Sequence, residues 1–447
     1  MITLITILTL SVFSLLPFEH SPQKVEDSKA VVASDSDSMR VADWHEDLMF
    51  IKNKFETEHY NLFRLMEKKD WEDSFTKLTQ NLPKLKDHEV ITETMKIIAK
   101  VGDGHSALYP PYEGKYHFHQ LPVSFHDFKD GLFIKGADPK YKSLVGHKLV
   151  SIGGISIEEV KKRLATITNR DNDQWIKLLG VEVYLTMPEI LYALELSDNI
   201  ESVTLELLND KNEIYKAEIR ANLFDISSTR YITVRPEWEA ANKDAKAPEP
   251  LYLKHTSEFP KDFYWFEYLE EKSMVYFQLN VVFDKPGEDL KSFCERMLNF
   301  IKEKNVERLV IDIRLNSGGN NQLNTGVLDQ VIKSNQINKE GNLFVIVGRR
   351  TFSAAMNLAT NLEQKTNAIF VGEPTGSSPN FVGEDNPSPL PKSKLVVSVS
   401  NRYWQDSSPD DNRKWITQDI YNVLSSEDYK NNIDPNMDAI LKYIDNK

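Results

Sequence analysis

The sequence contains a single cysteine, Cys294, among its 447 residues. No disulfide can therefore form within the chain, which excludes a disulfide-stapled secreted scaffold. Cys294 lies on the apolar stripe of the helical pattern DLKSFCERMLNFIKEK at residues 289–304. Free cysteines are among the most buried residue types, so we expect Cys294 to be a small core residue.

Positive charge is also scarce, with 54 Lys and Arg against 67 Asp and Glu and a formal net charge of -13. Proteins that bind nucleic acid need clustered Lys and Arg to displace counterions, so we expect no nucleic-acid partner. Tracts of Gly or Pro are missing, and the composition, 40% hydrophobic and 27% charged, is that of a globular protein. A chain of this length is too long for one compact core, and we expect two or three domains.

Long hydrophobic runs are limited to the first seventeen residues, MITLITILTLSVFSLLP, which carry no charge. Such a segment has the length of a signal-peptide core and is short for a membrane span. It lacks positive residues before it and a clear cleavage site after it, so a signal peptide and an uncleaved N-terminal anchor both remain open. Residues 18–40 are expected to be a disordered spacer. We expect an exported protein, extracellular or in the cell envelope, membrane-associated only through residues 1–17.

The rest of the chain divides into four parts. Residues 41–110 show helical spacing of apolar residues and predict a small helical domain. Residues 118–222 combine short strands, turns and two helices, which predicts a small peptide-binding barrel. Residues 223–260 are expected to be a linker. From residue 261 to 447, continuous apolar strands alternate with amphipathic helices, so the predicted fold class is α/β, with a mostly parallel sheet covered by helices on both faces.

The segment GRRTFSAAMNLA (348–359) follows the apolar run LFVIV and begins a helix near Ser353. Reactive groups in a parallel sheet collect at the carboxyl ends of strands, and the positive end of a helix dipole stabilises negative charge on a serine oxygen. The N–H of Ala354 is placed to donate to an oxyanion. The alternative, which this segment alone favours, is that Ser353 or Thr351 only caps the helix. The Gly-x-Ser-x-Gly elbow of α/β hydrolases is absent.

A second strand ends in VIDIRLNSGGNN (310–321), with the adjacent glycines Gly318 and Gly319. Glycines let backbone N–H groups approach a bound oxygen without a side chain between them. A plain turn is the alternative, and it is the more common use of Gly-Gly. The Lys-Ser/Thr of a phosphate-binding loop does not follow, so this segment is not such a loop.

A serine nucleophile needs a base, and none of the ten histidines lies after His255. Any histidine base must therefore come from outside the strand–helix domain. The best candidate is His105 in VGDGHSALYP (101–110), with a surface-loop histidine as the alternative, and weaker candidates are His117, His119 and His126. The HFH segment lacks a third and fourth ligand at plausible spacing, so we expect no metal and no other cofactor.

Taken together, these motifs resemble the tail-specific (C-terminal processing) serine peptidase family. The resemblance covers roughly residues 42–446 and is carried by DGHSAL (103–108), LVIDIRLNSGGN (309–320), VGRRTFSAAMNLA (347–359), VGEPTG (371–376) and LPKSKLVVSVS (390–400). It implies a ClpP/crotonase-like catalytic domain over residues 261–447 and a PDZ-like domain over residues 118–222.

The resemblance also implies roles for individual residues. Ser353 would be the nucleophile, and the oxyanion hole would be made by the N–H groups of Gly318, Gly319 and Ala354. Many members use a lysine base shortly after the segment matching VGEPTG, but this chain has Ser377 and Ser378 there. The missing lysine points to the tricorn and interphotoreceptor retinoid-binding protein-like branch. In the tricorn-like pattern a histidine from an earlier segment is the base, and His105 matches it.

A group that orients this histidine is expected as well, and the candidates are Asp103, Ser106 and Glu373. The resemblance implies an exported serine endopeptidase that cleaves peptides or unfolded proteins through an acyl-enzyme. The PDZ-like domain would present an extended peptide or a free C-terminus by strand addition. The alternative is a catalytically inactive protein on the same fold that binds a peptide or a lipid.

Overall fold

The computed structural model describes residues 33–225 and 234–446. The expected signal or anchor segment, residues 1–17, and residues 18–32 of the expected spacer lie outside the described residues. The first helix, α1 (Ala33–Glu58), takes in residues 33–40, so the spacer ends earlier than predicted. Once the apolar stripe of a helix is packed, each further residue adds a hydrogen bond at small cost. No helix within the described residues is long and apolar enough to cross a membrane.

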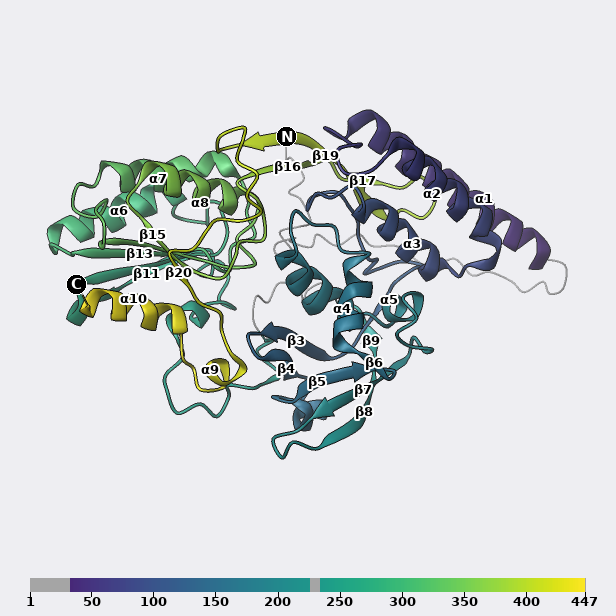
Figure 1. The fold of residues 1–447 in the computed structure, drawn as a ribbon, viewed down its shortest axis with the longest axis horizontal. Coiled ribbons are helices and arrows are strands. Elements are labelled where there is room, and N and C mark those ends of the chain that lie inside the picture. Colours follow the sequence, from purple (N-terminus) through teal and green to yellow (C-terminus); the bar gives the residue numbers. More distant parts are fainter. Residues whose placement is uncertain (1–32, 226–233, 447) are drawn as a thin grey trace.

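Three helices form the N-terminal part, as the periodicity predicts. They are α1, α2 (Lys68–Asn81) and α3 (Asp87–Ala99), drawn together in dark colours at the upper right of Figure 1. The apolar residues of α1 at three- and four-residue spacing are all buried, namely Trp44, Leu48, Ile51 and Phe55. This spacing places them on one face of the helix, and that face packs into the core.

A small antiparallel sheet forms the region that we expected to be PDZ-like. Its strands β4 (Gly131–Ala137), β5 (Lys148–Ile152), β7 (Ser202–Leu208) and β8 (Ile214–Arg220) follow the spatial order β10-β4-β5-β7-β8. Beside them, β3 (Val123–Phe128) pairs with β4, and β6 (Ile155–Ser156) pairs with β5. Strands β7 and β8 form an antiparallel hairpin. The edge strand β10 (Glu239–Ala240) comes from the segment that we expected to be a linker.

Helices α4 (Ile157–Ala165) and α5 (Pro188–Ala193), with the helical segment Ile176–Val183 between them, accompany this sheet. A short pair, β2 (His119–Gln120) with β9 (Asn222–Leu223), lies at the ends of the region. The small sheet and the N-terminal helices share one hydrophobic core. Residues from much later in the chain, among them Leu390 and Val397, complete that core.

The C-terminal part is built on a six-stranded sheet in the order β11-β12-β13-β14-β15-β20. These strands are β11 (Tyr264–Leu269), β12 (Met274–Leu279), β13 (Arg308–Asp312), β14 (Leu343–Val347), β15 (Ile369–Gly372) and β20 (Ile420–Tyr421). All neighbours are parallel except β11, which is antiparallel to β12. The predicted mostly parallel sheet is therefore confirmed.

Helices cover both faces of this sheet (Figure 1). One face carries α6 (Leu290–Glu303), α7 (Asn324–Lys333) and α8 (Ala354–Lys365), and the other carries α10 (Pro435–Asp445), which follows the short α9 (Ser426–Lys430). Two separate buried clusters fill the two sides. Cys294 is buried in the α6 side of the core, as predicted. Burial on both faces explains why strands such as β14 are apolar throughout.

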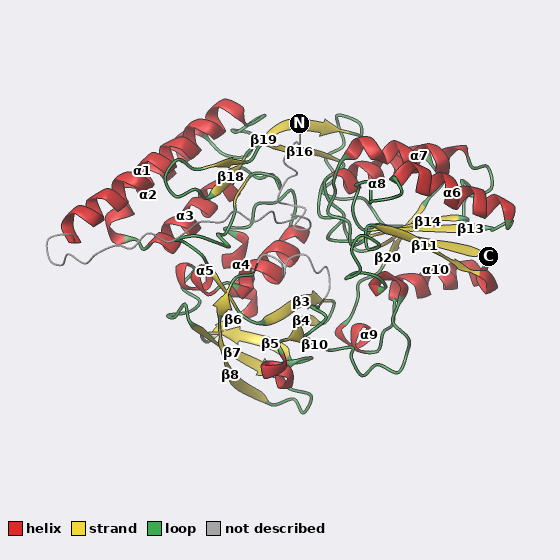
Figure 2. Cartoon of the chain, turned by 180° about the vertical axis from the view of Figure 1, so that it is seen from behind, coloured by secondary structure: helices red, strands yellow, loops and turns green. Residues whose placement is uncertain are grey.

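Two small antiparallel sheets join the C-terminal part to the N-terminal part. The ribbon of β16 (Asn380–Asp385) and β19 (Ser400–Gln405) spans the two parts in Figure 2. The other sheet has the order β1-β18-β17, with β1 (Ala107–Leu108), β17 (Ser388–Pro389) and β18 (Val396–Ser398). Because β1 pairs with β18, the loop just before β1, which carries His105, is tied to the C-terminal half of the chain.

Candidate active site

Ser353 stands between β14 and α8, at the N-cap position of the helix, with φ 51° and ψ -125°. A positive φ with this ψ is strained for a residue with a Cβ and costs about 1–3 kcal/mol. The side chain makes no capping hydrogen bond. The interpretation of Ser353 as a simple cap is therefore wrong, because its hydroxyl is turned away from the free N–H groups of the helix.

Thr351 does not cap the helix either. Its hydroxyl accepts a hydrogen bond from the Gly348 N–H at 3.0 Å and donates to the Ile313 carbonyl at 2.9 Å. These bonds tie the loop after β14 to the end of β13. Thr351 thus holds the shape of the loop that presents Ser353.

His105 lies next to Ser353, and its Nε2 is 3.0 Å from Ser353 Oγ. The imidazole is buried, with 3% exposure, which rules out the alternative of a surface-loop histidine. It is stacked between two rings, Phe352 with centroids 4.5 Å apart and Phe381 at 5.6 Å. Gly383 of β16 lies against the imidazole edge, where a Cβ would be 3.2 Å from Nδ1. The ring is held by packing on both faces.

Burial lowers the pKa of His105 to about 4, with Asp103 and the Val382 main chain acting in the opposite direction. The imidazole is therefore neutral at pH 7 and able to accept a proton. Among the described residues, none forms a full hydrogen bond with Nδ1. The proton on the neutral ring belongs on Nδ1 if Nε2 is to accept from Ser353.

The three residues expected to orient His105 do not contact its imidazole by hydrogen bonds. One carboxylate oxygen of Asp103 accepts two backbone hydrogen bonds, from the His105 N–H at 2.9 Å and from the Ser106 N–H at 2.6 Å. Ser106 Oγ is bonded to Ser400 Oγ at 3.1 Å. Asp103 and Ser106 therefore position the loop through its main chain and not through the ring.

Asp103 is itself fixed by residues that the sequence did not indicate. Its second oxygen lies 3.0 Å from His59 Nε2, and Ser400 Oγ donates to the first at 2.6 Å. Burial alone would raise the pKa of Asp103, but these two partners and the Ser106 N–H together hold it below its ordinary value. A buried carboxylate charge thus lies under the His105 loop.

Glu373 lies in a different cluster. Its carboxylate forms a two-point ion pair with Arg349, at 2.8 and 3.0 Å. Burial alone would raise the pKa of Glu373, but Arg349 holds it below its ordinary value. The role of Glu373 in this structure is to hold the first part of the loop that ends at Ser353.

The glycine turn lies directly against the serine, since a Cβ on Gly318 would be 2.6 Å from Ser353 Cβ and 3.0 Å from the Ala354 nitrogen. Gly318 has φ 115° and Gly319 φ 138°, a region that favours glycine. The Gly318 N–H already donates to Asn316 Oδ1 at 2.9 Å. We had expected the Gly318 N–H to be an open oxyanion donor, and this expectation is wrong. Gly318 instead supplies room beside Ser353.

The other two predicted oxyanion donors remain open. Within the described part of the chain, neither the Gly319 N–H nor the Ala354 N–H has a hydrogen-bond acceptor. Asn316 shapes this turn, since it also donates to the Leu279 carbonyl at 3.0 Å and accepts the Phe352 N–H at 3.2 Å through its own carbonyl. A negatively charged oxygen beside Ser353 would find these two donors.

The remaining histidine candidates lie elsewhere and do not contact Ser353. His117 bonds to the Phe224 carbonyl, His119 to Glu189 and His126 to Glu182. Across residues 33–225 and 234–446, no group of three or more His, Cys, Asp or Glu side chains could hold a metal ion.

The two serines at the expected lysine position differ in burial, and the buried one, Ser377, contacts Asp171.

No protein-family model matches the sequence, and no curated protein matches it significantly. Solved structures do match the fold. Mature CPAF complexed with lactacystin aligns with a TM-score of 0.61 and 11% identity over 91% of this chain and 98% of that chain. A second structure of mature CPAF aligns with a TM-score of 0.58 and 11% identity, over 91% of this chain and 96% of that chain. The photosystem II D1 C-terminal processing protease aligns with a TM-score of 0.40 and 15% identity, over 86% of this chain and 94% of that chain.

These solved structures are those of tail-specific (S41) peptidases, and the match to CPAF extends over most of both chains. This chain therefore has the fold of the tail-specific peptidases, as the motifs predicted. The resemblance and the α/β fold class are confirmed. The placement of Ser353, His105 and the glycine turn described above comes from the geometry of this chain alone.

Proposed function

We propose that this chain is a serine-type endopeptidase that cleaves peptides or unfolded proteins through an acyl-enzyme. The observation that carries the proposal is the 3.0 Å contact between Ser353 Oγ and His105 Nε2. It joins a hydroxyl on a strained backbone to an imidazole that burial keeps neutral. A serine hydroxyl bonded to a neutral imidazole is the arrangement that nucleophilic catalysis by serine needs.

In the first step, Ser353 Oγ attacks the carbonyl carbon of the substrate while its proton passes to His105 Nε2. Negative charge develops on the former carbonyl oxygen, and the N–H groups of Gly319 and Ala354 are the donors open to it. The positive end of the α8 dipole lies at the same place. These groups are already in position, so their reorganisation costs little at the moment of reaction.

The second step returns the proton. The imidazolium of His105 is stabilised by the buried charge of Asp103, which attracts it. Its proton then passes to the leaving amine, and the carbon–nitrogen bond breaks to leave the acyl-enzyme on Ser353. A water molecule next gives a proton to His105 and attacks the ester, after which Ser353 recovers its proton and the acid product leaves.

The substrate class of the proposal is peptides and unfolded proteins. The support is the fold shared with tail-specific peptidases and the PDZ-like sheet, in which β8 lies at an edge. An edge strand has backbone groups that an extended peptide can pair with. Such pairing would present a chain to the active site without reading much of its sequence.

Export is the remaining part of the proposal. It is supported by the uncharged apolar segment at residues 1–17. Expression of the full chain with a C-terminal tag and cell fractionation tests it. Recovery of the tagged protein in the cytoplasm with an intact N-terminus would contradict export while leaving the peptidase proposal standing.

Incubation with reduced, alkylated casein, followed by mass spectrometry of the fragments, tests the peptidase activity. We expect new termini from the wild type and none from Ser353→Ala or His105→Ala. Ser378→Ala is the matched control, because Ser378 Oγ bonds to the Lys414 carbonyl and has no part in the proposed chemistry. Cleavage that persists in Ser353→Ala would contradict the proposal.

A second candidate function is a catalytically inactive protein that binds a peptide or a lipid on this fold. One observation favours it, since no carboxylate among the described residues bonds to His105 Nδ1. It predicts a bound peptide or lipid with no turnover. Cleavage that depends on Ser353 would exclude it.

A further inference from the structure

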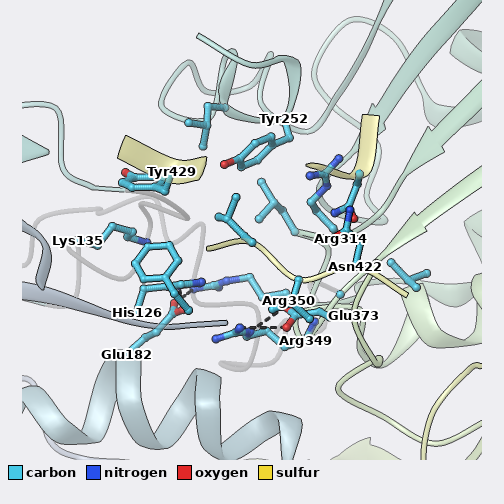
Figure 3. Close-up of a pocket in the computed structure, with 18 residues that line it drawn as sticks. His126, Lys135, Glu182, Tyr252, Arg314, Arg349, Arg350, Glu373, Asn422 and Tyr429 are labelled. Atoms are coloured by element: carbon cyan, nitrogen blue, oxygen red, sulfur yellow. Dashed lines mark hydrogen bonds and ion pairs between the residues drawn. The ribbon is translucent and has the colours of Figure 1, made fainter. Parts of the chain in front are cut away.

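A second buried site lies between the PDZ-like sheet and the catalytic sheet, at the carboxyl ends of β13, β14 and β15 (Figure 3). It encloses a cavity of about 100 Å³. The cavity is not lined by Ser353 or His105, nor by the glycine turn beside them. Ligands of parallel α/β sheets bind at the carboxyl ends of the strands, so this place is suited to a ligand.

Cationic side chains gather on one side of this cavity. Arg349 is paired with Glu373 at 2.8 Å, and Arg350 with Glu182 at 2.9 Å. The side chain of Lys135, which is 7% exposed, forms no hydrogen bond or ion pair among the described residues, although the charge of Glu182 attracts it. Arg349 Nη1 also lacks an acceptor. This side therefore holds one positive charge more than its two carboxylates neutralise.

The neighbouring polar groups do not change this balance. His126 bonds to Glu182 and is neutral at pH 7, because burial lowers its pKa to about 4. Arg314 lines the cavity too, but its guanidinium is held by Asp312 at 2.7 Å and Asp434 at 2.8 Å. The unpaired charge is thus that of Lys135.

A buried lysine without a partner is costly, because burial disfavours its charged form. Burial lowers the pKa of Lys135, with Glu182 acting in the opposite direction. One negative charge beside Lys135 would restore the balance. A dianion would bring more negative charge than the unpaired cation can neutralise, and an amine would be repelled.

Most of the remaining cavity wall is apolar, and its polar members are the amides Asn422 and Asn436. The apolar part includes the side chains of Phe128, Tyr252, Leu253, Leu315, Leu424 and Tyr429. Figure 3 shows Tyr252 and Tyr429 across the cavity from Arg349 and Glu373. A ligand that fits this wall has an apolar body as well as its single charge.

We propose that this cavity binds a small monocarboxylate, with its carboxylate at Lys135 and Arg349 and its apolar chain against Tyr252 and Tyr429. The cavity of about 100 Å³ is smaller than the cavity of about 150 Å³ that holds benzene, so the ligand has fewer non-hydrogen atoms than benzene, as propanoate does. The site is separate from the proposed peptidase centre. The ligand would touch both parts of the protein, Lys135 on β4 and Arg349 in the loop after β14.

Calorimetric titration of the full chain with propanoate tests this assignment, with propanamide, which has the same length and no charge, as the control ligand. We expect saturable binding of one propanoate per chain. Lys135→Met keeps the length of the side chain and removes its charge, and it should weaken binding at least about ten-fold. Lys142→Met, an exposed lysine in the segment after β4, should bind as the wild type does.

Ser353→Ala should also bind propanoate as the wild type does, so the result does not depend on peptidase activity. Lys135→Met should unfold at a temperature no lower than the wild type, because an unpaired buried charge is removed. No saturable binding of propanoate, equal binding of propanamide, or an unchanged affinity in Lys135→Met would overturn the assignment. Binding of a peptide with a free C-terminus but not of propanoate would overturn it too, since the site would then bind a peptide.

Discussion

Asp171 accepts a hydrogen bond of 2.9 Å from the N–H of Gly104, the residue that precedes His105. Its other oxygen contacts the hydroxyl of Ser377. Burial raises the pKa of Asp171 to about 7, with Ser377 opposing the rise and Asp103 adding to it. One partly buried carboxyl group thus joins the loop that carries His105 to the segment after β15.

This relationship predicts a pH-dependent stability. Between pH 3.8 and about 7 the carboxyl ionises in the unfolded chain and stays protonated in the folded chain, so the folded state loses stability as the pH rises through this window. Asp171→Asn resembles the protonated form. Relative to the wild type, it should raise the free energy of unfolding on the order of 2–4 kcal/mol at pH 8 and little at pH 4. Denaturant titrations at the two pH values measure this, and equal effects at both would contradict it.

The pH dependence of the proposed peptidase reaction follows from His105. Its pKa is lowered by burial from 6.5 to about 4, so the base stays unprotonated in mildly acidic solution. The acid limb of kcat/KM, measured with a fluorogenic unfolded substrate, should therefore lie near pH 4. An acid limb near pH 6.5 would contradict this prediction, because it would mean that water reaches the imidazole of His105.

The strained backbone of Ser353 predicts that two inactive variants differ in their free energy of unfolding. Ser353→Ala removes the hydroxyl but keeps a Cβ at φ 51° and ψ -125°. Ser353→Gly removes the Cβ as well and relieves the strain, so it should be more stable than Ser353→Ala by about 1 kcal/mol. Thermal unfolding of the two proteins measures the difference. A glycine variant that is less stable than the alanine variant would show that this conformation stores no strain.

The six-stranded sheet could be predicted well from the sequence, because its strands are continuous apolar runs and the helices beside it have clear apolar stripes. β14 and α6 begin and end within a few residues of the predicted positions. The pairing of Ser353 with His105 was reached only through a family resemblance, since the two are 248 positions apart. Composition and periodicity contain no information about such a contact.

The errors in the predicted site arise from contacts between distant segments. Local preference favoured Ser353 as a cap, but packing of the loop against Gly318 and Thr351 turns its hydroxyl toward His105. Asp103 was expected to contact the imidazole, whereas it binds the backbone of its own loop. An Asp side chain often accepts the N–H two residues after it, so its position before His105 could have suggested this contact. His59 and Asp171 have no local signal.

Gly318 predicts a matched pair of substitutions. Alanine at Gly318 would place a Cβ 2.6 Å from Ser353 Cβ at φ 115°, so it should destabilise the fold by about 2–4 kcal/mol and lower kcat at least about ten-fold. Gly287 also has a positive φ, 89°, but has open space around it. Gly287→Ala should therefore cost only about 1 kcal/mol and leave kcat unchanged. Equal effects of both substitutions on kcat would show that the contact with Ser353 does not matter.

The central claim is that Ser353 is a nucleophile activated by His105, and the rate at which a fluorophosphonate probe labels the folded protein tests it most directly. Peptide mapping should place the label on Ser353, with no labelling in Ser353→Ala. His105→Ala should slow the labelling by about 10²–10⁴-fold, because a positioned general base contributes that much. Labelling that avoids Ser353, or proceeds at the same rate without His105, would contradict the claim.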